Sequence, residues 1–440
     1  MTPRNTLLVA HTGLCLLISA LAVACGSSSQ ARPVDASGGA ANPAGGANTL
    51  GGANGAGAAS GSSAGGTSAA GGTAAGDTAA GGTAAGGSGQ AGAGNPAGGA
   101  NASGGAGGAS SGIRWLGRVD ASNPAAVKFA WSGTGFIASV SGTKISVKLQ
   151  TEATAPNTAF FQPVIDGTVG KRFSVPIGPA QTVVLANNLA AGTHRVELYR
   201  ESEGMYGDSV FSGFADGTLV GAPAAPGRLI EIIGDSISAG YGNLGVEVHP
   251  PWDNTCTFSL DTESAYQAYG WQLARALNAD VSIIAASGWG MYRDVQANPA
   301  NVLSAVYANT VGTAKTPGWS FAQQPDAVVI DLGTNDSAKD SDPGQPYEDA
   351  YVAFLKVVRA HYAKAWIFLT IGPMTGDPML TTMRTHLAHV LTTFGDAKTV
   401  TVDMPTQDST STGCDYHPNV AEDQKMAAVL KTAIAAKLGW

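Results

Sequence analysis

The chain has 440 residues and a formal net charge of −8 at pH 7, with 24 Lys and Arg against 32 Asp and Glu. Basic residues do not cluster anywhere in the sequence. Because phosphate binding needs clustered Lys and Arg, this composition argues against a nucleic-acid partner. A large share of the 60 glycines lies between residues 38 and 112, so the two ends of the chain must be interpreted separately from this stretch.

Residues 1–25 have the features of a lipoprotein-type signal peptide. Arg4 supplies a positive charge, residues 7–23 are almost wholly apolar, and small residues follow. The end of the segment resembles a bacterial lipobox with Cys25 as the lipidated residue; cleavage near Ala24 without a lipid is the alternative. We expect an exported protein, either held at the outer membrane or cell surface by this lipid or released outside the cell. Such a lipid is the only membrane contact we expect, because no other apolar run is long enough to span a bilayer.

Residues 26–112 are expected to form a disordered Gly/Ala-rich linker. From residue 31 onward this segment has no aromatic side chain and almost no large aliphatic one. Burial therefore cannot offset a backbone entropy cost of about 1–2 kcal/mol per residue. A flexible coil of about 80 residues has an end-to-end distance of roughly 50 Å, which suits a tether.

Residues 113–222 show a different pattern, in which short runs alternate apolar and polar residues. Turn-forming clusters at residues 141–143 and 166–167 separate some of these runs. Alternation with a period of two between turns predicts antiparallel strands in a β-sandwich domain. The expected strands are residues 136–140, 144–149, 162–165, 182–185 and 194–199.

Residues 228–440 alternate between buried strands and amphipathic helices, which predicts an α/β domain with a parallel sheet flanked by helices. In such sheets the functional residues lie at the carboxyl ends of the strands. The expected strands are residues 229–233, 281–286, 327–332, 366–371 and 399–403. The expected helices are residues 263–277, 347–363, 379–394 and 419–438.

A candidate nucleophile and a candidate base occupy two of these strand ends. Ser236 follows the first strand, where its hydroxyl would project into the crevice, and Asp235 before it is expected to act as an N-cap or a local turn acceptor. His417 precedes the last helix and has the side chain whose pKa suits a general base near neutrality. A nucleophilic serine needs such a base, and the base needs an orienting acceptor, for which Asp415 is the local candidate.

Candidate oxyanion donors follow the second and third strands of this domain. Gly288 lies in a glycine-containing turn after the second strand, where its main-chain N–H could reach a substrate. Asn335 follows the third strand, and its side-chain amide could donate to a developing negative oxygen, together with the N–H of Ser236. Asp336 is expected to be structural and to bond main-chain N–H groups.

Cys256 and Cys414 are the cysteines that remain after the signal peptide and Cys25. In an oxidising compartment they are expected to form a disulfide, with two unpaired buried thiols as the alternative. The chain-entropy model gives such a bridge roughly 4–5 kcal/mol. No metal site and no cofactor are expected, because no His or Cys partner of these cysteines lies at zinc spacing.

The four blocks, in their order along the chain, resemble those of the SGNH (GDSL-like) hydrolases. The resemblance implies a flavodoxin-like parallel sheet, Ser236 as nucleophile and His417 as base. It also implies an oxyanion hole formed by the N–H groups of Ser236 and Gly288 with the Asn335 amide. Much of the superfamily has Asp three residues before the His, where this chain has Cys414.

The whole arrangement resembles carbohydrate esterase family 2, in which an N-terminal jelly-roll domain precedes the SGNH domain. In that family the Asp two residues before the His can complete a triad, but some members work as a dyad with a backbone carbonyl orienting the His; Asp415 is our choice. The resemblance implies removal of O-acetyl groups from plant polysaccharides such as xylan or glucomannan. The matching stretches are residues 130–135, 231–236, 240–242, 286–290 and 413–419.

Trp289 and Tyr416 adjoin the catalytic blocks, and aromatic faces suit pyranose rings, so both are expected to line the substrate site. The expected partner is an acetylated polysaccharide or oligosaccharide, and the chain is expected to be a monomer. Two alternatives remain. One is a lipase or thioesterase of the same superfamily that acts on longer acyl chains, and the other is a surface carbohydrate-binding protein with a vestigial hydrolase.

Overall fold

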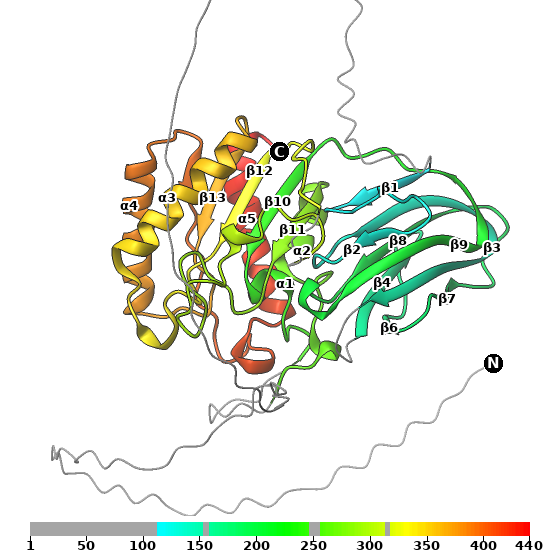
Figure 1. Ribbon diagram of the computed structural model, residues 1–440, viewed down its shortest axis with the longest axis horizontal. Coiled ribbons are helices and arrows are strands. Elements are labelled where there is room, and N and C mark those ends of the chain that lie inside the picture. The colour runs from blue at the N-terminus through cyan, green and yellow to red at the C-terminus, as the bar shows by residue number, and fades with distance from the viewer. Residues whose placement is uncertain (1–111, 153–157, 246–255, 313–316) are drawn as a thin grey trace, which may run out of the picture. The chain divides into compact units, whose positions relative to one another are not determined.

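The computed structural model describes residues 112–152, 158–245, 256–312 and 317–440 (Figure 1). The expected signal peptide, the expected lipidation of Cys25 and the expected linker up to residue 111 lie outside the described residues. Within the described ranges, no helix is long and apolar enough to cross a membrane.

The first domain is antiparallel, as expected, and has nine strands in the described part of the chain. They are β1 (Ile113–Leu116), β2 (Val127–Phe129), β3 (Gly135–Glu152), β4 (Thr158–Ile165), β5 (Thr168–Val169), β6 (Phe173–Pro176), β7 (Gln181–Ala186), β8 (Thr193–Arg200) and β9 (Asp208–Gly221). Residues 135–141 of β3 pair with β8, residues 145–149 pair with β7, and β9 runs beside both parts. The long strand β3 therefore connects two groups of strands that enclose an aromatic-rich core (Figure 1).

The turn expected at residues 141–143 is wrong, because these residues lie inside β3. Gly142 has φ of +153° and its N–H donates to the Gly192 carbonyl, while the Thr143 carbonyl accepts from Leu189 N–H. The register of β3 against β9 shifts in this region. Strand β3 is thus irregular at these residues but continues through them. Hydrogen bonds from neighbouring loops stabilise this part of the strand, and the local sequence does not predict those bonds.

The second domain contains a parallel sheet of five described strands in the order β11-β10-β12-β13-β14. This order is that of flavodoxin-like sheets and agrees with the expected fold class. The strands are β10 (Leu229–Gly234), β11 (Asp280–Ala285), β12 (Ala327–Asp331), β13 (Trp366–Thr370) and β14 (Thr399–Thr401). The helices are α1 (Ser236–Ala239), α2 (Tyr269–Leu277), α3 (Gly344–His361), α4 (Met379–Phe394) and α5 (Val420–Leu438).

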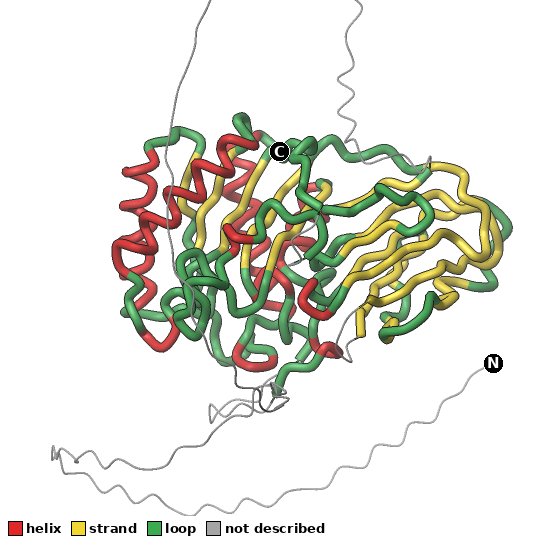
Figure 2. The backbone as a smooth tube through the Cα atoms, in the orientation of Figure 1, coloured by secondary structure: helices red, strands yellow, loops and turns green. Residues whose placement is uncertain are grey.

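Helices cover both faces of the parallel sheet, as Figures 1 and 2 show. Successive side chains of a strand point to opposite faces. Ile232 of β10 packs in the cluster that contains Leu430 of α5, whereas the next residue, Ile233, packs in the cluster that contains Leu355 of α3. This two-sided burial explains why the strands are continuous apolar runs in the sequence.

Helix α2 begins at Tyr269, not at residue 263 as expected. Ala268 has an extended backbone (ψ 156°), and the preceding residues form a turn held by the first domain. The buried Glu201 carboxylate accepts from Ser264 Oγ at 2.8 Å and from Tyr266 N–H at 3.0 Å. Tyr266 is nevertheless buried. The apolar spacing therefore correctly indicated a buried face, although the residues of that face before Tyr269 form a turn and not a helix.

The stretch at residues 130–135 lies where the antiparallel domain packs on the α/β domain. Trp131 is fully buried in the cluster that contains Ile233 and Leu355. The Gly133 carbonyl accepts from Trp271 Nε1 at 3.1 Å, and a Cβ at Gly133 would collide with that indole ring. These residues therefore serve domain packing.

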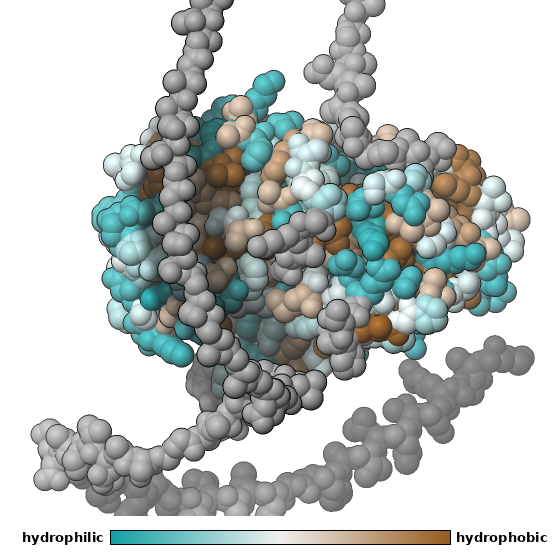
Figure 3. Space-filling model, in the orientation of Figure 1, coloured by the Kyte–Doolittle hydropathy of each residue, from teal (hydrophilic) through white to brown (hydrophobic). Residues whose placement is uncertain are grey.

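Exposed large apolar side chains occur on both domains in the described part of the chain. On the face drawn in Figure 3, hydrophobic residues lie in small groups among hydrophilic ones. Val169 and Val220 are exposed on the first domain, and Val295 and Val357 on the second. Exposed apolar residues that occur singly are normal for globular proteins.

Candidate active site

Ser236 begins helix α1 directly after strand β10. Asp235 is the N-cap of this helix, and its carboxylate accepts from Ile237 N–H at 3.0 Å. A Cβ at Gly234 would collide with Ser238 Oγ, so the tight turn requires glycine at that position. The turn places Ser236 at the carboxyl end of the sheet with 6 % of its surface exposed.

His417 lies within hydrogen-bond distance of this serine. Its Nε2 is 2.8 Å from Ser236 Oγ, and its Nδ1 is 3.0 Å from the main-chain carbonyl oxygen of Asp415. An Nδ1–H that donates to this carbonyl leaves Nε2 free to accept the serine proton. Burial lowers the pKa of His417 to about 4, so the imidazole is neutral near pH 7.

The orienting atom of Asp415 differs from the one expected for a triad. The carbonyl of Asp415 bonds to Nδ1, while carboxylate oxygen Oδ2 accepts from Tyr241 O–H at 3.0 Å and from Phe258 N–H at 3.1 Å. The geometry is that of a Ser-His pair oriented by a backbone carbonyl. The carboxylate instead connects the loop that carries His417 to the segments that contain Tyr241 and Phe258.

This loop has an unusual backbone that its surroundings stabilise. Asp415 (φ 49°) and Tyr416 (φ 61°) are both left-handed, a conformation that costs most residues about 1–3 kcal/mol. The expected disulfide joins Cys256 to Cys414, and Asp415 N–H donates to the Cys256 carbonyl at 2.8 Å. The disulfide and this hydrogen bond hold the segment in which the Asp415 carbonyl points at His417.

Tyr241 contacts the base; the sequence placed it in the family-like stretch at residues 240–242 but assigned it no role in the site. Its ring centroid lies 4.3 Å from that of His417 and 3.8 Å from that of Phe258, on which it stacks. The flanking residues Gly240 and Gly242 both have positive φ. The Gly-Tyr-Gly sequence was therefore a usable signal, because two such glycines indicate a turn that presents the residue between them.

A carboxylate from the antiparallel domain holds the loop that contains Gly288. The buried Glu203 accepts from Ser287 N–H at 2.7 Å and also from Ser287 Oγ. Burial raises the pKa of Glu203 to about 7. Gly288 follows with φ of +79°, and its N–H has no hydrogen bond within the part of the chain that the structure describes. No local pattern in the sequence marks Glu203, which lies 84 residues before Ser287.

Asn335 lies between the nucleophile turn and the Gly288 loop. Its Nδ2 donates to Asp235 Oδ2 at 3.1 Å and to the Trp289 carbonyl at 2.9 Å. Because Nδ2 carries two hydrogens, donation to an oxyanion requires one of these bonds to be shared or exchanged. Its role in an oxyanion hole stays a prediction.

The expectation that Asp336 is structural is confirmed. Its carboxylate accepts from the N–H groups of Met291, Tyr292 and Arg293 at 2.7–3.0 Å. These bonds order the segment that follows the Gly288 loop.

The two aromatic residues expected to bind substrate differ in environment. Trp289 is partly buried and packs against the core beneath α3 and α4. Tyr416 is 37 % exposed and adjoins His417 in the chain. Their contact with sugar stays a prediction, for which Tyr416 has the more open position.

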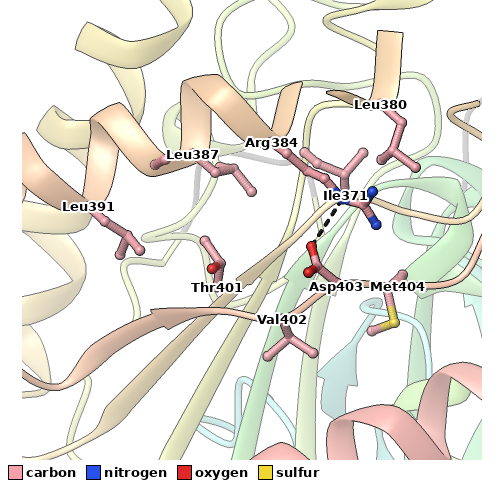
Figure 4. A pocket seen from close by; sticks show the side chains of 10 residues that line it. Ile371, Leu380, Arg384, Leu387, Leu391, Thr401, Val402, Asp403 and Met404 are labelled. Atoms are coloured by element: carbon pink, nitrogen blue, oxygen red, sulfur yellow. Dashed lines mark ion pairs between the residues drawn. The ribbon is translucent and has the colours of Figure 1, made fainter. Parts of the chain in front are cut away.

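A separate pocket lies between helix α4 and the residues of and after strand β14 (Figure 4). Leu387 and Leu391 contribute apolar walls, and Arg384 forms an ion pair of 3.0 Å with Asp403. None of the four catalytic blocks lines this pocket.

The parallel sheet and the order of the four blocks are those of a GDSL-like hydrolase. Residues 232–424 match the GDSL-like Lipase/Acylhydrolase family, and residues 115–224 match the family described as Carbohydrate esterase 2 N-terminal. A solved family two carbohydrate esterase from Clostridium thermocellum, in complex with cellohexaose, is 34 % identical with a TM-score of 0.70, over 75 % of this chain and 100 % of that chain. The chain belongs to carbohydrate esterase family 2.

Two curated relatives match this chain over part of their own length. The Cellulase/esterase CelE of Acetivibrio thermocellus is 35 % identical over 336 residues, which is 75 % of this chain but only 40 % of that relative. An Acetylxylan esterase / glucomannan deacetylase of Cellvibrio japonicus is 27 % identical over 278 residues, which is 60 % of this chain and 73 % of the relative.

Proposed function

We propose that this chain is an exported serine esterase that removes O-acetyl groups from plant polysaccharides such as xylan and glucomannan. The observation that carries the proposal is the 2.8 Å distance between His417 Nε2 and Ser236 Oγ in a member of carbohydrate esterase family 2. The relatives named as acetylxylan esterase / glucomannan deacetylase support an acetyl ester on a plant polysaccharide as the substrate.

In the first step, Ser236 Oγ attacks the acetyl carbonyl carbon while His417 Nε2 takes the hydroxyl proton. The Asp415 carbonyl holds the imidazolium that forms. The tetrahedral oxyanion faces the N–H groups of Ser236 and Gly288, with Asn335 as a further donor once one of its present bonds is exchanged. His417 then gives its proton to the sugar oxygen, which leaves as the alcohol.

In the second step, water attacks the acetyl group on Ser236 as His417 takes a proton from that water. Collapse of the second tetrahedral intermediate releases acetic acid, which ionises to acetate in solution, while His417 returns its proton to Ser236. Each proton thus moves through the same Nε2 atom, which is neutral and available because burial lowers the pKa of His417.

The direct test is acetate release by the full chain from acetylated xylan and acetylated glucomannan. The Ser236→Ala variant is expected to lose at least about 10³ in kcat. Ser238→Ala is the matched control, because this hydroxyl belongs to the same short helix but bonds Tyr269 O–H at 2.7 Å. A Ser236→Ala variant that keeps a near-normal rate would remove Ser236 from the mechanism.

Hydrolysis rates of the acetyl, butyryl and octanoyl esters of p-nitrophenol test the preference for acyl-chain length. The proposal expects kcat/KM to fall as the chain lengthens. Activity confined to long chains would keep the Ser-His chemistry and overturn the acetyl substrate. Binding of polysaccharide without turnover of any ester would favour the carbohydrate-binding alternative.

We extend the proposal to cellular location: the chain is exported and anchored by a lipid on Cys25. The support is the sequence of residues 1–25. Radioactive palmitate is expected to label the full chain and not its Cys25→Ser variant, and equal labelling of the two proteins would reject the anchor. Size-exclusion chromatography with light scattering measures the molar mass in solution and so tests the proposal that the chain is a monomer.

A further inference from the structure

Two histidines and one glutamate lie together between helices α3 and α4. His386 and His389 come from α4, where a spacing of three residues places them on one face, and Glu348 comes from α3. One nitrogen of each imidazole and one carboxylate oxygen all lie within 4.8 Å of one another. The esterase mechanism uses none of these groups.

Both histidines contact the same carboxylate oxygen of Glu348. His386 Nδ1 is 2.7 Å and His389 Nδ1 is 2.9 Å from the same oxygen, Oε1 of Glu348. Two imidazole nitrogens and a carboxylate oxygen are ligands that Zn²⁺ prefers. Atoms bound at about 2.1 Å to a tetrahedral ion lie roughly 3.4 Å apart, so small side-chain movements would open this arrangement around an ion.

A second carboxylate already orients one of the histidines. Asp342 Oδ1 lies 2.8 Å from His386 Nε2. Donation of Nε2–H to Asp342 leaves the Nδ1 lone pair directed at the centre of the cluster, which is the carboxylate–histidine arrangement common around protein-bound zinc. Glu348 and Asp342 together carry two negative charges, which match a divalent cation.

The site is also accessible. The side chain of His389 is 60 % exposed, whereas those of His386 and Glu348 are each 11 % exposed. An ion could enter beside His389 and keep a water molecule as its fourth ligand. We propose that Glu348, His386 and His389 bind one Zn²⁺ ion, supported by Asp342, and that the bound ion connects α4 to α3.

The first experiment is calorimetric titration of the purified full chain with ZnCl₂ after chelator treatment, with MgCl₂ as the comparison ion. We expect one Zn²⁺ per chain with a roughly micromolar Kd and no comparable Mg²⁺ binding. At an ion concentration 100 times Kd, Tm is expected to rise by about 4 °C.

Variants assign the binding to this cluster. His389→Gln is expected to weaken Zn²⁺ binding at least about tenfold without lowering Tm in chelator, because its side chain is largely exposed. Asp342→Asn is expected to weaken it about 10–100-fold although it removes no ligand. His194→Gln is the matched control, since His194 bonds Asp166 at 2.6 Å in the first domain, and should bind Zn²⁺ like the unaltered chain.

Two results would overturn the proposal. One is the absence of Zn²⁺ binding by the unaltered chain, which would leave the cluster as an ion-pair network. The other is Zn²⁺ binding of equal affinity in the His386→Gln/His389→Gln double variant, which would place the ion elsewhere.

Discussion

Replacement of Asp415 by Asn separates the two ways in which His417 could be oriented. The hydrogen-bond acceptor for Nδ1 is the main-chain carbonyl of Asp415 at 3.0 Å, which the substitution leaves in place. The Asn side-chain oxygen can also accept from Tyr241 O–H and Phe258 N–H, as Oδ2 does now. We therefore expect kcat to fall by less than about tenfold, or about 1.4 kcal/mol of transition-state stabilisation.

The size of the fall in kcat distinguishes a backbone carbonyl from a carboxylate as the group that bonds Nδ1. In a Ser-His-Asp triad the same change holds the imidazole in the wrong tautomer and costs about 10⁴ in kcat. Asp415→Ala provides a structural comparison, since it removes the acceptor of the hydrogen bonds from Tyr241 O–H and Phe258 N–H, each worth about 1 kcal/mol. It should lower both Tm and kcat more than Asp415→Asn does.

The assay is the initial rate of acetate release and of p-nitrophenyl acetate hydrolysis, with Ser236→Ala as the background. Tm is measured for each variant so that loss of folding is distinguished from loss of chemistry. An Asp415→Asn protein with unchanged Tm and a kcat reduced by 10³ or more would refute the carbonyl-oriented pair and restore the carboxylate as the orienting group.

Three further predictions concern the surroundings of the pair. Burial lowers the pKa of His417 to about 4 and the base acts when neutral, so kcat/KM should rise with pH through about pH 4 and then level; an acid limb near pH 6.5 would contradict the effect of burial. Reduction of the Cys256–Cys414 disulfide should lower Tm and reduce kcat about tenfold or more, which is checked by measuring both with and without reductant. Unchanged kinetics in a fully reduced protein would show that the loop that carries His417 keeps its conformation without the disulfide. Glu203→Gln leaves Ser287 one acceptor oxygen instead of two, so kcat should fall about tenfold with little change in KM. A change confined to KM would argue against the prediction that Glu203 positions the loop that contains Gly288 for stabilisation of the oxyanion.

Elements decided by local pattern were predicted well from the sequence. Helix α4 has the expected bounds, Met379–Phe394, and strand β10 begins at the expected residue, Leu229. Helix α4 has apolar residues at helical spacing and β10 is a short apolar run, and most of these apolar residues are buried. The blocks around Ser236 and His417 were recognisable because they lie at strand ends, where parallel sheets gather functional residues.

Features decided by contacts between distant residues were missed. The start of α2 depends on Glu201, which lies 63 residues before Ser264 and accepts its hydroxyl. The sequence indicated Asp415 as the orienting residue but could not show which of its oxygens faces His417, because that depends on two left-handed backbone conformations. The histidine and glutamate cluster was missed for the same reason, since its members come from two helices.

The antiparallel domain is part of the catalytic unit rather than an appendage. The fully buried Arg118 donates to Glu231 Oε2 at 3.2 Å, and Tyr362 O–H donates to the same oxygen. Breaking a buried ion pair by removing one partner typically costs about 3–5 kcal/mol, because the remaining charge is left uncompensated. Without the first domain, Glu231 in strand β10 would lose Arg118, and Ser287 beside Gly288 would lose Glu203. Strand β10, which precedes Ser236, and the loop that contains Gly288 thus both contact buried side chains from the other domain. We therefore expect the two domains to act together, whether or not the first one also binds sugar.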